Sequence, residues 1–123
     1  MAGIIEKKGK ILGTGTPLIC VPVTEETQEK IVEEIRILTE QNVDMIEWRM
    51  DWFSEVTDKE AVKSVLEEIR PYVENTLFLL TFRSKMQGGQ LQMKPAEVLE
   101  LNEAAAKTGV ADFCLLYTSD AAD

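Results

Sequence analysis

The chain has no histidine and only two cysteines among its 123 residues. The cysteines, Cys20 and Cys114, are too few and too far apart for a disulfide framework or a zinc-ligand pattern. Without histidine, the usual nitrogen ligand of zinc is missing as well. We therefore expect no metal site.

Clustered basic residues and long apolar runs are also missing. The net charge of −9 argues against nucleic acid or an anionic membrane as a partner, because both need clustered Lys and Arg. No apolar run approaches the ~20 residues that span a bilayer, and the first residues lack the basic-then-apolar shape of a signal peptide. We therefore expect a cytoplasmic protein. A small anionic ligand stays open, since one site needs only local positive charge.

The chain does contain apolar runs that alternate with amphipathic stretches. We expect a hairpin at residues 4–6 and 11–12, strands at 18–23, 43–51, 76–83 and from 110, and helices at about 24–41, 57–70 and 95–107. Thr24 or Thr27 is expected to cap the first helix, and Thr57 opens a capping box before the second. Strands joined by single helices imply right-handed crossovers and a parallel sheet. A doubly wound sheet and part of a (β/α)8 barrel both fit this single domain.

The stretch VDMIEWRMDWF, residues 43–53, carries the most informative charges. Alternate residues of a strand point to opposite faces, so Glu47 and Arg49 share one face of it. The same alternation in the next strand places Arg83 on the corresponding face. These side chains then lie near the carboxyl ends of neighbouring strands, where barrel active sites are found. Two arginines and a carboxylate suit a small polyhydroxy acid, and a structural salt-bridge cluster is the alternative.

Three neighbouring features have a structural interpretation beside the functional one. We expect Asp51 to cap the strand end or to pair with one arginine. Trp48 is expected to pack in the core rather than to contact a ligand. The pair Gly88 and Gly89, in the polar loop after the third strand, is either a lid hinge or a plain turn. No nucleotide-binding glycine pattern is present.

Taken together, ICVPV, VDMIEWRMDWF and LFLLTFRSKMQGG resemble type I 3-dehydroquinate dehydratases, from about Gly3 to Phe113. The resemblance implies a (β/α)8 TIM barrel, of which this chain would hold the N-terminal hairpin, about three βα units and the start of the fourth strand. It implies a lyase of the shikimate pathway, which leads to chorismate and the aromatic amino acids. The enzyme would convert 3-dehydroquinate to 3-dehydroshikimate without a cofactor, and the complete enzyme would be a homodimer.

The resemblance also assigns roles to individual residues. The family forms a Schiff base between a lysine and the substrate, and a histidine moves the proton. This sequence has no histidine and no lysine inside an apolar strand, so no catalytic residue is assigned to it. The substrate-binding positions implied by the resemblance are Glu47, Trp48, Arg49 and Arg83, and the lid or its surroundings would include Gln87, Gly88 and Gly89.

Two positions depart from the family pattern. Pro22 stands where some members carry a serine that contacts the substrate. Gln87 stands where the pattern usually has a glutamate near the catalytic histidine. A neutral amide forms hydrogen bonds but supplies no negative charge to orient that histidine.

The last ten residues, CLLYTSDAAD, replace the Ile-Asp-x-Glu strand that the resemblance leads us to expect. They resemble a translated sequencing adapter. We therefore expect residues 1–113 to be the N-terminal half of a dehydratase domain and residues 114–123 to be an artefact. On this interpretation the chain as written has no dehydratase activity. The alternatives are a non-catalytic module that binds small anions through Arg49 and Arg83, and a half-barrel that associates with itself.

Sequencing the source DNA through the codon for Phe113 tests the adapter interpretation. We expect the natural frame to continue into an Ile-Asp-x-Glu strand, followed by a histidine and a lysine borne on a strand. The interpretation is wrong if an intact genomic clone carries the same bases for residues 114–123, well clear of any read end.

Overall fold

The computed structural model describes residues 5–7, 10–12, 19–83 and 94–117. The strands in these ranges are β1 (Ile5–Lys7), β2 (Lys10–Leu12), β3 (Cys20–Val23), β4 (Met45–Arg49), β5 (Leu77–Arg83) and β6 (Phe113–Tyr117). The helices are α1 (Gln28–Glu40), the 3-10 turn η1 (Met50–Trp52), α2 (Lys59–Ile69) and α3 (Pro95–Lys107). The predicted order of elements is confirmed.

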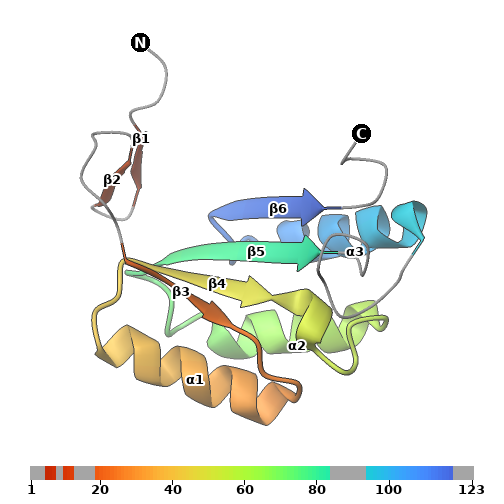
Figure 1. Ribbon diagram of the computed structural model, residues 1–123, viewed down its shortest axis with the longest axis horizontal. Helices are drawn as coiled ribbons and strands as arrows, with labels where there is room; N and C mark the ends of the chain where they lie inside the picture. The colour runs from red at the N-terminus through yellow and green to blue at the C-terminus, as the bar shows by residue number, and fades with distance from the viewer. Residues whose placement is uncertain (1–4, 8–9, 13–18, 84–93, 118–123) are drawn as a thin grey trace.

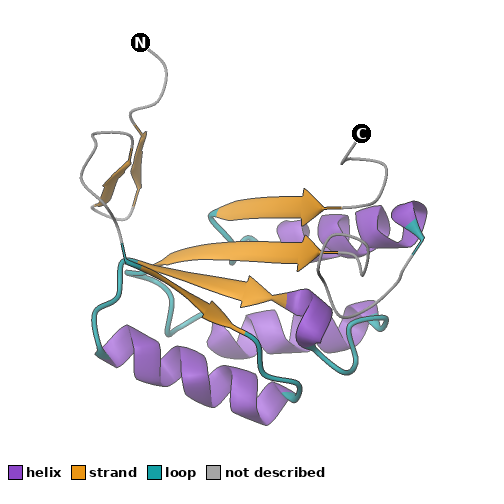
Figure 2. Ribbon diagram, viewed as in Figure 1, coloured by secondary structure: helices purple, strands orange, loops and turns teal. Residues whose placement is uncertain are grey.

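The main sheet has the strand order β3-β4-β5-β6, and all its strands are parallel. Helices α1, α2 and α3 lie on the same face of this sheet, side by side (Figures 1 and 2). The antiparallel pair β1-β2 lies beyond the ends at which the parallel strands begin (Figure 1). A doubly wound sheet has helices on both faces, whereas barrel strands follow one another with every helix outside. The described part of the chain therefore has the arrangement of a barrel segment.

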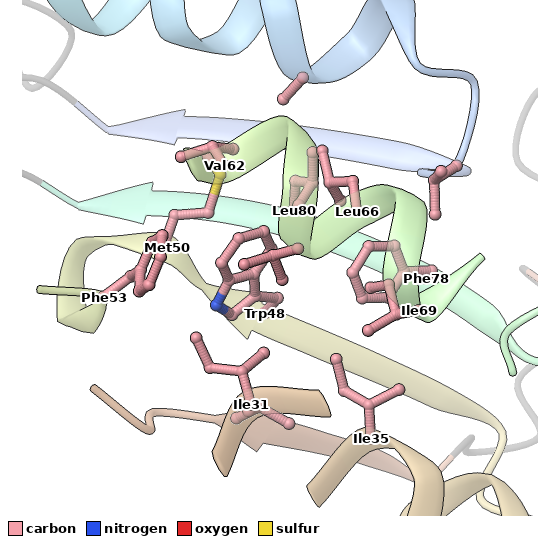
Figure 3. Packing of buried hydrophobic residues seen from close by; sticks show 14 of the residues in the cluster. Ile31, Ile35, Trp48, Met50, Phe53, Val62, Leu66, Ile69, Phe78 and Leu80 are labelled. Carbon is pink, nitrogen blue, oxygen red and sulfur yellow. The ribbon is translucent and has the colours of Figure 1, made fainter. Parts of the chain in front are cut away.

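The core lies between the sheet and its helices. Side chains of β4 and β5 that point toward the helices are fully buried, and burying one such side chain contributes about 1.5–3 kcal/mol. They pack against the apolar faces of α1 and α2 (Figure 3). The core residues labelled in Figure 3 are Ile31, Ile35, Trp48, Met50, Phe53, Val62, Leu66, Ile69, Phe78 and Leu80.

The helix starts differ from expectation in two places. The helix expected from about residue 24 begins at Gln28. Thr27, one of the two candidates, caps α1, and its hydroxyl accepts the N–H of Lys30 at 3.3 Å. Thr57 does not cap α2. Asp58 occupies the N-cap position instead, and its carboxylate accepts the N–H of Glu60 at 3.0 Å. Aspartate satisfies a first-turn N–H at least as well as threonine, so the helix begins one residue later than the capping-box pattern indicates.

Strand boundaries also differ from expectation. The strands expected from residues 43 and 76 begin at Met45 and Leu77. The strand expected at residues 43–51 ends at Arg49, where the chain turns into η1. The fourth parallel strand begins at Phe113 rather than at Val110, which is buried ahead of it. This strand continues to Tyr117 and pairs with β5, with Tyr117 opposite Arg83. Residues 114–117 therefore occupy a strand position, while their origin stays a prediction.

Two aspartates hold the beginnings of the parallel strands together. Asp44 directly precedes β4, and its carboxylate accepts the N–H of Ile19 at 2.8 Å. Asp112 directly precedes β6, and its carboxylate accepts the N–H of Phe78 at 2.8 Å. The N–H of Asp112 donates in return to the carbonyl oxygen of Phe78 at 2.8 Å. Each aspartate thus aligns its own strand with the strand before it.

We expect Asp112→Ala to lower the free energy of unfolding by about 1–3 kcal/mol, because a half-buried N–H loses a charged acceptor. Urea denaturation followed by far-UV circular dichroism measures this loss. Asp112→Asn is the matched control, since its amide oxygen still accepts the bond and should limit the loss. Equal losses in the two variants would show that the hydrogen bond does not hold this strand.

Candidate active site

The polar face of the sheet is the face that points away from the helices. Along β4, Glu47 and Arg49 are half-buried on this face, and the alternate residues Ile46 and Trp48 are buried on the other. The register pairs Arg49 with Thr81 of β5. Arg83 lies two residues further along β5 and so shares the face. The structure therefore brings Glu47, Arg49 and Arg83 to one face near the carboxyl ends of neighbouring strands, as the alternation predicts.

The turn after β4 brings a buried carboxylate to this face. Asp51 lies in η1, and only 2% of its surface is exposed. Its two oxygens accept hydrogen bonds from Arg49, at 3.1 Å from Nε and 2.9 Å from Nη2. Asp51 Oδ1 also accepts the backbone N–H of Arg83 at 3.3 Å. The structural role expected for Asp51, as the partner of one arginine, is confirmed.

The charges of this face are balanced. Two carboxylates, of Glu47 and Asp51, stand against the two guanidinium groups of Arg49 and Arg83, so the formal charges cancel. A buried ion pair is tolerated only where its geometry is good and its remaining groups are bonded, which the bidentate contact between Arg49 and Asp51 provides. A planar guanidinium group held in this way, as that of Arg49 is, is suited to bind carboxylate and hydroxyl oxygens of a small ligand.

Trp48 is not on this face. It lies between Glu47 and Arg49 in the strand, so its side chain points to the helices, where it is fully buried. Its ring centroid is 5.9 Å from that of Phe53 (Figure 3). The expectation that Trp48 packs in the core is therefore confirmed, and the substrate-binding role that the resemblance implied for it is corrected.

The remaining positions assigned from the resemblance divide into two groups. Pro22 of β3 is exposed and pairs with Glu47, so the position where some family members carry serine does border the polar face. Gln87, Gly88 and Gly89 lie outside the described residues.

Neither cysteine has the lowered thiol pKa that a nucleophile needs. Burial raises the pKa of the Cys20 thiol, and the negative charge of Glu47 raises it further. Burial also raises the pKa of the Cys114 thiol. A thiol with a raised pKa stays protonated at neutral pH and is a poor nucleophile. In the described part of the chain, no group of three His, Cys, Asp or Glu side chains is placed to hold a metal ion.

A hollow of about 610 Å³ lies on the helical side, between α2 and α3. Charged side chains of both signs line it, and they pair with one another: Lys59 contacts Glu100 at 3.7 Å, and Arg70 contacts Glu67 at 2.7 Å. Arg70 also donates to the carbonyl oxygen of Thr108 at 2.6 Å. The contacts of Lys59 with Glu100 and of Arg70 with Thr108 connect the two helices across this hollow. Among the helices described, none is long and apolar enough to cross a membrane.

A family model described as type I 3-dehydroquinase matches residues 19–114. The chain belongs to this family. It is 40% identical over 105 residues to a 3-dehydroquinate dehydratase of Listeria monocytogenes, with 85% of the chain and 42% of that protein covered. It is 37% identical over 112 residues to the Bacillus licheniformis enzyme of the same name, with 91% of the chain and 44% of that protein covered.

Solved structures agree with the family assignment. The type I 3-dehydroquinate dehydratase of Clostridium difficile, crystallised with covalently modified comenic acid, superimposes with a TM-score of 0.87 at 34% identity, over 93% of this chain and 45% of that one. The Geobacillus kaustophilus 3-dehydroquinate dehydratase gives a TM-score of 0.85 at 31% identity, over 90% of this chain and 44% of that one. The chain thus spans less than half the length of these type I dehydroquinases. Within their barrel fold, the polar face corresponds to the barrel interior.

Thr81 is a residue of this face that the sequence analysis did not single out. It pairs with Arg49 across the strands and is fully buried. Its hydroxyl has no hydrogen-bond partner within the ranges that the structure describes. The signal in the sequence was its alternation with Arg83 in the TFR motif, which places a small polar side chain beside two charged ones.

We expect Thr81→Val to raise the free energy of unfolding by about 1 kcal/mol, because valine keeps the shape and removes an unsatisfied buried hydroxyl. Thr108→Val is the control and should lower it, since the Thr108 hydroxyl donates to Ala105 at 2.7 Å and accepts the N–H of Val110 at 3.3 Å. Denaturant titration measures both changes. A loss for Thr81→Val would show that its hydroxyl is bonded in solution.

Proposed function

We propose that this chain forms the substrate-binding part of a 3-dehydroquinate dehydratase, a lyase that removes water from 3-dehydroquinate to give 3-dehydroshikimate. One observation carries the proposal: in a chain of this family, Glu47, Arg49 and Arg83 meet on one face at the carboxyl ends of two neighbouring strands. A barrel holds its active site at that end.

The chemistry of the three side chains fits the substrate. 3-Dehydroquinate carries a carboxylate, several hydroxyl groups and a ketone on one small ring. The guanidinium groups of Arg49 and Arg83 bind oxygens through paired N–H groups, and the Glu47 carboxylate accepts hydrogen bonds from hydroxyls. Glu47 and Arg49 are about 7 Å apart along the strand, at roughly 3.4 Å per residue, which matches the width of a substituted six-membered ring.

The proposed reaction proceeds through a Schiff base between a lysine and the substrate ketone, with a histidine that removes the α-proton and protonates the departing hydroxyl. The 123 residues contain no histidine, so they do not supply this base. In this proposal the side chains described here bind and orient the ring. The Clostridium difficile relative, crystallised with a covalently modified acid, supports both covalent chemistry and an acidic ligand.

The same proposal extends to cellular context. We propose that the protein acts in the cytoplasm, that the complete enzyme is a homodimer, and that neither nucleic acid nor a membrane is its partner. The net charge of −9 supports the last two points, because polyanionic partners need a basic surface.

Calorimetric titration of the chain with 3-dehydroquinate tests the proposal. We expect binding, and we expect Arg83→Ala to weaken it about tenfold or more, since a hydrogen bond to a charged group is worth about 1.5–3 kcal/mol. Arg36→Ala is the control: Arg36 pairs with Glu33 and Glu40 on exposed α1, so its removal should leave the affinity unchanged.

Inorganic phosphate, titrated in parallel, separates the proposal from its main alternative. A dehydratase site should prefer the ring acid over phosphate. Equal affinity for both would contradict the proposal and favour a module that binds small anions of any kind. A chain that binds neither and elutes as one discrete dimer would favour the self-associating half-barrel.

A further inference from the structure

Asp51 holds one edge of the Arg49 guanidinium group. A guanidinium group is planar and has five N–H donors, which form one edge at Nε and Nη2 and another at Nη1 and Nη2. Asp51 occupies the first edge with both of its oxygens. The side chain of Asp51 is completely buried, and that of Arg49 is 14% exposed. The buried Asp51 carboxylate thus holds the Nε and Nη2 edge of Arg49, and the Nη1 and Nη2 edge points away from Asp51.

Asp51 also joins the two strands that carry the arginines. Its Oδ1 atom accepts the backbone N–H of Arg83 at the end of β5, as well as the Nε–H of Arg49. The turn that holds Asp51 is itself fixed, because Met50 and Phe53 on either side of it are buried in the core. One carboxylate therefore sets the position of a side chain on β4 relative to the backbone of β5.

The negative charge of Asp51 disfavours binding of an anionic ligand, whereas its hold on Arg49 favours it. A carboxylate beside the site repels an anion, so its neutralisation alone would strengthen anion binding. The loss of a bidentate contact would instead release the Arg49 side chain, and the ligand would have to restrain it again, which weakens binding. The two roles predict opposite changes in affinity when the charge is removed with little change in shape.

We infer that Asp51 is a positioning residue, which acts through Arg49 by holding its Nε and Nη2 edge so that the other edge is presented to a ligand carboxylate or hydroxyl. The identity of that ligand as 3-dehydroquinate rests on the proposed function. The arrangement of Asp51, Arg49 and Arg83 does not.

Asp51→Asn tests the inference, because asparagine has nearly the same shape and retains one acceptor oxygen. We expect the dissociation constant for 3-dehydroquinate to rise about tenfold, the equivalent of about 1.4 kcal/mol. Glu33→Gln is the matched control: Glu33 makes the same bidentate contact with Nε and Nη2 of Arg36, at 3.2 and 2.6 Å, on exposed α1. It should not change the dissociation constant.

A double-mutant cycle shows whether Asp51 acts through Arg49. Lysine has no paired edge for a carboxylate to hold, so Asp51→Asn should have little further effect on affinity in an Arg49→Lys background. Unchanged or tighter binding by Asp51→Asn overturns the inference. An equal loss in both backgrounds also overturns it, since Asp51 would then support the fold rather than Arg49.

A spectroscopic measurement keeps the inference testable without any ligand. We expect the Nε–H proton of Arg49 to give a resolved NMR signal that exchanges with water more slowly than that of Arg36, and Asp51→Asn to abolish this protection. If the unchanged chain binds no 3-dehydroquinate, the proposed function fails. The positioning role is then still tested by exchange: if the Nε–H proton of Arg49 stays protected in Asp51→Asn, that role is overturned as well. If Asp51→Asn does not fold, equal exchange at Arg49 and Arg36 in the unchanged chain overturns it.

Discussion

The two-residue alternation of β4 is the constraint on which both the core and the candidate site depend. Ile46 and Trp48 are drawn into the core by the burial of their apolar surface, and this forces Glu47 and Arg49 to the opposite face. No separate interaction is needed to direct the charged side chains outward from the helices. Core packing and the placement of the charged side chains thus both follow from one strand conformation. A change in the packing of Ile46 or Trp48 therefore shifts Glu47 and Arg49 as well.

Much of this arrangement could be predicted from the sequence, since it rests on local periodicity. Pro95, which suits a first helical turn, and Gly109, which suits a helix end, predicted α3 at its observed bounds, and the parity of Glu47, Arg49 and Arg83 placed them on one face. The choice between a doubly wound sheet and a barrel segment could not be made locally. It follows from the presence of all described helices on the same face, which is a property of the chain path and not of any one segment (Figure 2).

The parts that sequence reasoning missed depend on contacts between distant residues or on competition between neighbours. β4 ends at Arg49 and η1 begins, because the turn lets Asp51 bond to Arg49 and to the N–H of Arg83. The N–H of Arg83 is on another strand, so this contact is not visible in the local sequence. Asp58 replaced Thr57 as the helix cap through competition between two adjacent residues that both suit the position. For Trp48 the residue pattern correctly predicted the core, and only the role implied by the family motif was wrong.

The aspartates that precede β4 and β6 each bond to the strand before their own, Asp44 to the start of β3 and Asp112 to β5. A slip of one residue between paired strands would turn every side chain to the other face and exchange Glu47 and Arg49 with Ile46 and Trp48. Between β3 and β4, and between β5 and β6, such a slip must break a hydrogen bond to one of these carboxylates. The bonds that fix the strand register thus lie at the amino ends of the strands, whereas Arg49 and Arg83, whose positions depend on that register, lie at the carboxyl ends.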